Sequence, residues 1–269
     1  MPRILLVNDD GVYSPGLLTL KREIQNLGEV TVVAPRKEKS GIGKALSCNL
    51  VNVRKVSLAD GSEAYAIDGT PADAYFIATH KILRGKPDLL VSGINLGPNL
   101  GIDDFFTSGT LGATIEAAIH KVPAIAVSYC MERPADLKNE FLKVDMAHLF
   151  LAAKIAKKTA EYILKNGMPP NVDIISINVP EKIVSLSFEA TTLSYKGFMD
   201  LYVSRKGGYI ISQWTLFDYP DDVEGTDIYT IKDGKISVTP IKLKFIHNVE
   251  GLNDLICFLN SKLNDSFPL

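Results

Sequence analysis

Cysteine and histidine are scarce in this sequence, and their spacing excludes several kinds of site. The three cysteines stand far apart, at positions 48, 130 and 257, and form no CxxC pair. This pattern argues against a disulfide framework or a thiolate metal site and suits a reducing compartment. The four histidines form neither an HxxxH nor an HExxH pair, so a zinc site of the metalloprotease type is not indicated.

The chain also lacks an excess of one charge and a long apolar run. Lys and Arg number 29 against 31 Asp and Glu, a net charge of -2, so we expect no basic face for a nucleic-acid polymer or an anionic membrane. No apolar run approaches the length of a membrane span. Charged residues arrive by Arg3 and Asp9, which is unlike a secretory signal. These absences predict a soluble, cytoplasmic protein.

Several familiar nucleotide and hydrolase motifs are missing. No GxGxxG follows the first apolar run, so a dinucleotide-binding fingerprint is not supported. The GIGK at 41–44 lacks the GxxxxGK spacing of a P-loop, and Ala45 stands where that motif has Ser or Thr. A GxSxG nucleophile elbow is absent as well.

The sequence does contain an alternation of apolar strands and amphipathic helices. The run at 4–7 is typical of a strand buried on both faces of a parallel sheet. Turn residues Asp60 and Gly61 divide 47–67 into a predicted hairpin. Further strands are predicted at 30–35, 89–91, 124–127 and 173–180, and helices at 17–27, 70–83, 110–120 and 143–166. The glycine-rich stretch at 92–109 is predicted to be one long loop. This order predicts an α/β fold with a doubly wound, mostly parallel sheet.

The pattern changes beyond about residue 185. Aromatic residues and alternating patterns dominate 188–239, broken by turn residues at 206–208 and 232–235. A final helix is predicted at 249–263. We therefore divide the chain into a catalytic domain, 1–184, and a C-terminal antiparallel and helical region, 185–269, for substrate capping or subunit contact.

The most informative stretch is the acidic pair after the first strand. In an open α/β sheet, ligands bind outside the carboxyl ends of the strands. Asp9 and Asp10 stand at such an end, and neighbouring side chains on a regular strand point to opposite faces. They act together only where the strand gives way to a loop, which Gly11 permits. Two adjacent carboxylates repel unless a cation lies between them. The alternative is that one caps the next helix and the other is solvated.

Two further loops carry neutral oxygen ligands at predicted strand ends. Ser40 follows the second strand and Asn95 follows the third. Together with the two carboxylates they form an all-oxygen set that suits Mg²⁺, Mn²⁺ or Ca²⁺. Such a site leaves room for water and a substrate oxygen, and it can polarise a phosphoryl group. Taken singly, each of the two is equally well an ordinary turn residue.

A possible anion site follows in the same region. Ser108, Gly109 and Thr110 begin the helix that runs to residue 120. A helix N-terminus favours an anion, and the two hydroxyls add donors. By itself this pattern favours a routine N-cap over an anion site. The nearby metal site makes phosphate the better interpretation, with Asn99 as a further donor.

The motifs together resemble the stationary-phase survival protein SurE family. They are ILLVNDDG at 4–11, AP at 34–35 with SG at 40–41, DGTPAD at 68–73, SGIN at 92–95, NLG at 99–101 and SGT at 108–110, with weaker matches in NVP at 178–180, GTD at 225–227 and SVTP at 237–240. The resemblance implies a Rossmann-like N-terminal domain and a homodimer or homotetramer formed through the C-terminal part. It also implies a 5'-nucleotidase that uses one divalent ion, Mg²⁺ or Mn²⁺, to hydrolyse nucleoside monophosphates. The family's metal ligands fall on Asp9, Asp10, Ser40 and Asn95, and its phosphate contacts fall on Asn99, Ser108, Gly109 and Thr110.

The predicted function is a metal-assisted phosphomonoesterase, with two alternatives. Asp9 and Asp10 are the catalytic candidates, and the sequence does not choose which of them accepts a proton from water. A receiver-like phosphoacceptor domain also has an acidic pair after its first strand, but it needs an acceptor Asp where this chain has SGIN at 92–95. A non-catalytic nucleotide-binding module differs only in whether the bound nucleotide is consumed.

Overall fold

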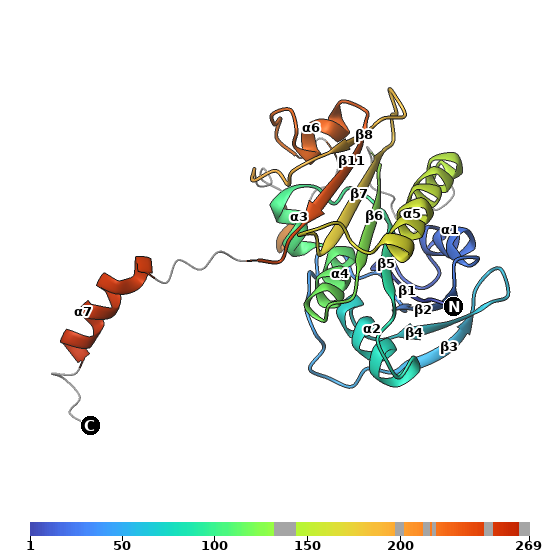
Figure 1. The fold of residues 1–269 in the computed structure, drawn as a ribbon, viewed down its shortest axis with the longest axis horizontal. Helices are drawn as coiled ribbons and strands as arrows, with labels where there is room; N and C mark the ends of the chain where they lie inside the picture. Colours follow the sequence, from blue (N-terminus) through green and yellow to red (C-terminus); the bar gives the residue numbers. More distant parts are fainter. Residues whose placement is uncertain (132–143, 197–201, 212–215, 217–218, 245–249, 264–269) are drawn as a thin grey trace.

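The computed structural model describes residues 1–131, 144–196, 202–211, 216, 219–244 and 250–263. Its centre is a nine-stranded sheet with the order β3-β4-β2-β1-β5-β6-β7-β11-β8 (Figure 1). The strands are β1 Arg3–Val7, β2 Glu29–Pro35, β3 Val53–Ser57, β4 Glu63–Ile67, β5 Leu89–Leu96, β6 Ala124–Cys130, β7 Ile174–Pro180, β8 Phe188–Ala190 and β11 Ile236–Ile241.

Helices cover both faces of this sheet (Figure 1). They are α1 Pro15–Ile24, α2 Pro71–Ile77 continued by a π-helix at Ala78–Ile82, α3 Gly101–Thr107, α4 Gly109–Ile119 and α5 Met146–Asn166. Side chains of β1 alternate between the two layers. Ile4 and Leu6 pack with α1 and α5 in one core, whereas Leu5 and Val7 pack with α2 and α4 in the other. Because every β1 side chain from Ile4 to Val7 is fully buried, the strand has to be apolar throughout, as predicted.

The topology places a ligand crevice at β1. The strands β2, β1, β5, β6 and β7 run parallel, with β2 on one side of β1 and β5 on the other. The chain moves from β1 outward to β2, and later returns to the opposite side of β1 through β5. Such a reversal leaves an opening at the carboxyl ends of the two strands between which it occurs. That opening lies between β1 and β5, where Asp9, Asp10 and Asn95 follow or end their strands.

Most predicted elements are confirmed. Ser14 caps α1, and its hydroxyl accepts a hydrogen bond from Gly16 N at 3.2 Å. Thr70 forms a capping box with Asp73 at the start of α2. The predicted hairpin is the antiparallel pair β3 and β4, which join the sheet through the parallel pairing of β4 with β2. The doubly wound, mostly parallel sheet is therefore confirmed. Helix α1 ends at Ile24 rather than at residue 27.

The prediction was wrong for 92–109, which was expected to be one long loop. Strand β5 continues to Leu96, and α3 follows at Gly101–Thr107. A bulge lies within β5, because its register against β6 shifts between Ser92 and Asn95. At Gly93 the backbone has φ 131°, and a Cβ atom would lie 2.3 Å from Val127 O. Polar residues and glycine interrupt the apolar run here, so periodicity could not reveal the continuing strand.

The C-terminal part agrees with the prediction only in places. An antiparallel hairpin, β9 Tyr202–Arg205 and β10 Gly208–Ile211, surrounds the predicted turn at 206–207. Strand β11 is antiparallel to β7, but β8 is parallel to β11, and α6 Asp227–Lys232 was not predicted. Both β8 and β11 extend the main sheet. The predicted division at residue 184 stays a prediction.

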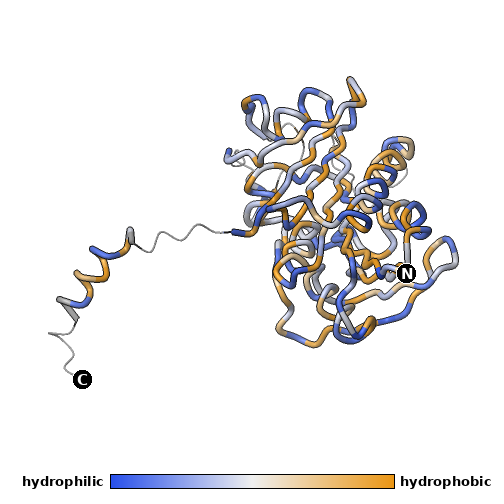
Figure 2. The backbone as a smooth tube through the Cα atoms, viewed as in Figure 1, coloured by the Kyte–Doolittle hydropathy of each residue, from blue (hydrophilic) through white to orange (hydrophobic). Residues whose placement is uncertain are grey.

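The last helix stands apart from the body of the molecule (Figure 1). A short 3-10 turn at Glu250–Leu252 leads into α7 Asn253–Leu263, close to the prediction of 249–263, although residue 249 itself lies outside the described residues. The predicted start of the long helix at 143 also lies outside them. Figure 2 shows hydrophobic residues along α7, and Leu252, Leu255, Ile256 and Phe258 are exposed. No helix within the described ranges has the length and apolarity to cross a membrane.

Candidate active site

The turn after β1 brings the acidic pair to the crevice between β1 and β5. The strand ends at Val7, and Gly11 takes φ 106°, a left-handed conformation that suits glycine. The Asn8 side chain donates to Gly11 O at 3.0 Å, and Val12 N donates to Pro35 O of β2 at 2.8 Å. In this tight turn, neighbouring side chains no longer point to opposite faces as they do on a regular strand. This is the arrangement in which we expected Asp9 and Asp10 to act together.

Asp9 directly contacts the start of α4. Its Oδ1 accepts a hydrogen bond from Thr110 Oγ1 at 2.5 Å, and its Oδ2 accepts from Thr110 N at 3.1 Å. Gly109 lies against the same carboxylate, since a Cβ atom there would be 2.8 Å from Asp9 Cβ. The Ser108 hydroxyl accepts from Leu111 N at 3.2 Å and caps α4. The structure thus joins the first acidic residue to the predicted phosphate segment, with Ser108 serving as an N-cap.

Asp10 faces the end of β5. Its Oδ2 accepts a hydrogen bond from Leu96 N at 3.3 Å, which brings the carboxylate beside the backbone of Asn95. The Asn95 side chain donates to Gly97 O at 3.0 Å through Nδ2, so the oxygen of that amide is turned away from Gly97. The predicted neighbourhood of Asp10 and Asn95 is therefore present in the backbone.

Ser40 belongs to a loop that is hydrogen-bonded to the turn after β1 and to the end of α3. Lys39 N donates to Asp9 O at 2.8 Å, and Gly43 N donates to Thr107 O at 2.6 Å. The Ser40 hydroxyl donates to Glu38 Oε1 at 2.6 Å. Glu38 was not selected from the sequence, because it stands in a run of charged, exposed residues that carries no distinguishing signal. It is a third carboxylate at this edge.

Asn99 is placed differently from the other predicted residues. Its side chain is buried, and Nδ2 donates to Ser128 Oγ of β6 at 2.8 Å. Its backbone is held by Asn178 of β7, whose Oδ1 accepts from Asn99 N at 3.1 Å and whose Nδ2 donates to Asn99 O at 3.0 Å. The sequence did not reveal that Ser128 and Asn178 hold Asn99 in place. The available signal was the polar side chain of Asn178 within a buried strand.

The electrostatics of the acidic pair fit a cation. Burial raises the pKa of Asp9, and burial together with the charge of Asp9 raises the pKa of Asp10 well above its usual value. Glu38 adds a further negative charge to both. A divalent ion would relieve this repulsion. The described residues contain no group of three or more His, Cys, Asp and Glu that could hold a metal, so any ion here depends on hydroxyl and amide oxygens beside the two aspartates. These hard donors are the type that Mg²⁺ and Mn²⁺ prefer.

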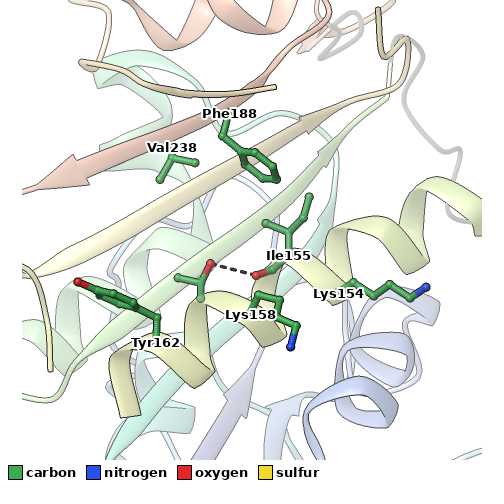
Figure 3. A pocket seen from close by; sticks show the side chains of 7 residues that line it. Lys154, Ile155, Lys158, Tyr162, Phe188 and Val238 are labelled. Atoms are coloured by element: carbon green, nitrogen blue, oxygen red, sulfur yellow. Dashed lines mark hydrogen bonds between the residues drawn. The ribbon is translucent and has the colours of Figure 1, made fainter. Parts of the chain in front are cut away.

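A separate hollow lies between α5 and the strands β8 and β11 (Figure 3). Its lining contains none of the predicted site residues. Tyr162 and Phe188 contribute apolar surface, and Lys154 and Lys158 also line the hollow with their amines pointing away from it. Thr159 is tied to its own helix by a hydrogen bond to Ile155 O at 3.0 Å. The acidic, oxygen-rich edge at β1 and this hollow are therefore distinct features.

Fold and site together define an α/β protein with a doubly wound sheet and an acidic pair set against a helix N-terminus at the switch point. The family model described as "Survival protein SurE" matches residues 4–199. The chain belongs to the SurE family, and the resemblance seen in its motifs is confirmed.

Known relatives match most of the chain. It is 44% identical over 192 residues to the 5'-nucleotidase SurE of Methanothermobacter thermautotrophicus, covering 71% of this chain and 72% of that protein. It is 39% identical to the 5'-nucleotidase SurE of Methanococcoides burtonii, covering 90% and 93%. The crystal structure of the SurE protein from Aquifex aeolicus superposes with a TM-score of 0.73 at 30% identity, covering 96% of this chain and 100% of that one.

Proposed function

We propose that this protein is a metal-dependent 5'-nucleotidase that hydrolyses nucleoside monophosphates to nucleoside and phosphate. Family membership and the relatives named 5'-nucleotidase SurE support the reaction class. The observation that carries the proposal is the contact of Asp9 with Thr110 at the start of α4. It joins a carboxylate suited to a cation with a helix N-terminus suited to a phosphate, at the switch point of the sheet.

Asp9, Asp10, Ser40 and Asn95 would hold one divalent ion, Mg²⁺ or Mn²⁺. Such an ion supplies a Lewis acid that polarises a phosphoryl oxygen and makes water a better nucleophile. The chain's own contribution is to place oxygen donors on three loops that hydrogen bonds fix to one another. One of the two aspartates would accept the proton of the attacking water.

The start of α4 would bind the phosphate group. Gly109 lets the backbone approach Asp9 closely, and the N-terminal N–H groups and Thr110 favour negative charge there. The backbone N–H of Asn99 is bound to Asn178 and one N–H of its side-chain amide is bound to Ser128, so the second amide N–H would be its donor to phosphate. Ser108 sets the helix start through its cap.

The alternatives are less well supported. A receiver-like domain needs an acceptor carboxylate at the end of β5, where the chain has Asn95 and Leu96, and the relatives are nucleotidases by name. A nucleotide-binding module without turnover would have the same site, so only an activity measurement distinguishes it from the proposed enzyme. Phosphate release from a panel of nucleoside monophosphates, with Mg²⁺ or Mn²⁺ and with or without a chelator, distinguishes all three.

The decisive variant is Asp9→Asn. We expect it to abolish phosphate release while the protein stays folded, because the neutral amide weakens cation binding and the pairing with Thr110. Asp173→Asn is a matched control, since this carboxylate precedes β7 at the other end of the sheet and pairs with Lys242. Near-normal turnover by Asp9→Asn, with the control also normal, would remove the assignment.

We also propose a cytoplasmic homodimer or homotetramer. The thiols of Cys48, Cys130 and Cys257 are free, which suits a reducing compartment. The exposed apolar side chains of α7 and the exposed Phe188 beside the hollow on α5 support self-association. Sedimentation of the full chain against a chain ending at residue 244 tests this part of the proposal; a monomer in both cases contradicts it.

A further inference from the structure

The short helix α3 connects the two segments that the proposed function assigns to phosphate. Asn99 precedes the N-terminus of α3. Ser108 is both the C-cap of α3 and the N-cap of α4. Ser108 N donates to Asp104 O of α3 at 2.9 Å. Any displacement of α3 therefore moves Asn99 on one side and the Ser108–Thr110 segment on the other. The way in which α3 is held decides the geometry of both.

The N-terminus of α3 is held by residues far away in the sequence. Gly101 N donates to Asp227 Oδ2 at 2.7 Å, and Ile102 N donates to Ser194 O at 2.8 Å. Asp227 Oδ1 in turn accepts from Ser194 N at 3.0 Å. Asp227 is fully buried. One carboxylate thus joins α3, the segment at 194 and the start of α6.

A second buried carboxylate supports the same helix. Asp104 Oδ2 accepts from Leu100 N at 2.7 Å, and it also accepts a hydrogen bond from the Tyr219 hydroxyl. Tyr219 and Leu100 belong to one apolar cluster with Ile228 of α6. Two independent contacts therefore run from residues beyond 185 to the helix between the phosphate segments.

The backbone at the joint is specialised as well. Gly101 has φ 68°, and a Cβ atom there would lie 3.2 Å from Ser194 O. The close approach of the segment at 194 and the left-handed turn both require glycine. A buried carboxylate that accepts backbone N–H groups forms a charge-assisted bond, roughly twice as strong as a neutral one. The hydrogen bond from Gly101 N to Asp227 therefore fixes the direction in which α3 leaves Gly101.

From these contacts we infer that Asp227 is a positioning residue for phosphate, which holds α3 and through it Asn99 and the Ser108–Thr110 segment. This inference rests on the proposed function and deepens it. Asp227 does not touch the site itself. It acts through Gly101, and the Tyr219–Asp104 pair acts on the same helix through Leu100.

The variants are chosen to separate positioning from stability. Asp227→Asn keeps the size of the side chain but replaces one carboxylate oxygen by an amide NH₂ group. One backbone N–H that donates to Asp227 then faces another donor and loses its hydrogen bond. Tyr219→Phe removes only the hydroxyl that reaches Asp104. Asp221→Asn is the matched control, because this exposed carboxylate lies in the same region and pairs with Lys232 at the surface. Each variant is measured as the full chain for thermal unfolding, kcat and KM on a nucleoside monophosphate, inhibition by inorganic phosphate, and the Mn²⁺ concentration for half-maximal activity.

We expect Asp227→Asn to lower kcat/KM about tenfold or more and to weaken inhibition by phosphate about fivefold or more. Tyr219→Phe should show the same direction at about threefold. The Mn²⁺ requirement should change less than kcat/KM, because the Asp10 carboxylate is bound to Leu96 N and the Asp9 backbone to Lys39 N, and only the Asp9 carboxylate contacts Thr110. A purely structural role would lower the unfolding temperature but leave the kinetic constants of the folded protein unchanged.

The inference is overturned if Asp227→Asn and Tyr219→Phe both fold and match Asp221→Asn in kcat/KM and phosphate inhibition. If Asp227→Asn does not fold, Tyr219→Phe alone decides. Failure of the proposed function gives a different result: the unaltered chain would then release no phosphate from any nucleoside monophosphate. In that case binding of inorganic phosphate with Mn²⁺ is measured by calorimetry, and equal binding, or none, in the unaltered chain and the variants overturns the inference.

Discussion

Replacing Gly109 by alanine tests the proposed site most directly, because the structure fixes the size of the clash. A Cβ atom at this position would lie 2.8 Å from Asp9 Cβ, 3.0 Å from Asp9 Oδ2 and 3.2 Å from the Ile42 side chain. Unstrained contacts between carbon atoms are about 3.5–4.0 Å. Asp9 and the start of α4 must therefore separate by about 0.7–1.2 Å.

Such a separation breaks the contact on which the proposal depends. Thr110 N lies 3.1 Å from Asp9 Oδ2, and a hydrogen bond that lengthens to about 3.6 Å or more is lost. A misplacement of about 1 Å costs about 10²-fold in rate. We expect Gly109→Ala to lower kcat/KM by about 10²-fold. Its stability should fall by about 1–3 kcal/mol from overpacking, offset in part by the better helix propensity of alanine.

The assay is phosphate release from a nucleoside monophosphate with saturating Mn²⁺, together with thermal unfolding. Gly109 does not have a left-handed φ, so the backbone itself accepts alanine and only the clash is tested. Gly208→Ala is the control, since a Cβ atom there meets nothing within 4 Å. The reasoning is refuted if folded Gly109→Ala keeps kcat/KM within about threefold of the unaltered chain, because a 1 Å shift should cost about 10²-fold.

Three further outcomes are expected. Thr110→Val keeps the side-chain shape but removes the hydroxyl that donates to Asp9, so phosphate release should fall about 10-fold, for about 1.5 kcal/mol of lost hydrogen bonding, with little change in the unfolding temperature. Burial raises the pKa of Asp104 to about 8, so the folded state binds this proton more tightly than the unfolded state. Stability should therefore be greatest below about pH 4 for this group and decline by up to about 1.4 kcal/mol per pH unit until about pH 8; denaturant unfolding at pH 6 and pH 8 should show the decline, and Asp104→Asn should flatten it. Lys44→Met leaves the buried Glu116 carboxylate without its lysine partner, which should cost about 3 kcal/mol in thermal or denaturant unfolding; an unchanged midpoint would show that the ion pair contributes nothing.

The sheet could be predicted because burial on two faces leaves a plain mark in the sequence. The run at 4–7 and the strand at 124–127 are apolar without interruption, as a doubly covered strand requires. The cap Thr70 was equally predictable, because a capping side chain bonds to the backbone within a few residues of its own position. Such features depend on neighbours within a few residues, which is the range over which a single sequence is informative.

The bulge in β5 and the helix α3 could not be predicted for the opposite reason. Gly93 is required by an approach to Val127 O on the neighbouring strand, and nothing near it in the sequence states that requirement. Helix α3 has no side-chain cap of its own at Leu100. Its N-terminus is held instead by Asp227, which lies 126 residues away. Propensity describes local preference and is overridden where tertiary contacts supply the missing bonds.

The candidate site shows the same division. The sequence identified Asp9, Asp10, Ser40 and Asn95 through residue type and position at strand ends, and the topology brings those ends to one crevice. It assigned Asn99 to phosphate without indicating that its amide is bound to Ser128. Glu38 was missed because an exposed carboxylate in a charged loop resembles any other until its hydrogen bond to Ser40 and its charge interaction with the acidic pair are known.

These contacts also change how the C-terminal part is understood. The family model ends at residue 199, yet Tyr219 and Asp227 lie beyond it and bind the helix between the two segments that we propose for phosphate. Strand β11 from the same part pairs with β7, which carries the Asn178 that fixes Asn99. Asn99 and Gly101, which follow β5, are therefore held by residues 79 and 126 positions further along the sequence. The region beyond residue 184, which the sequence predicts to serve substrate capping or subunit contact, thus also supplies hydrogen bonds to α3 and a strand that pairs with β7.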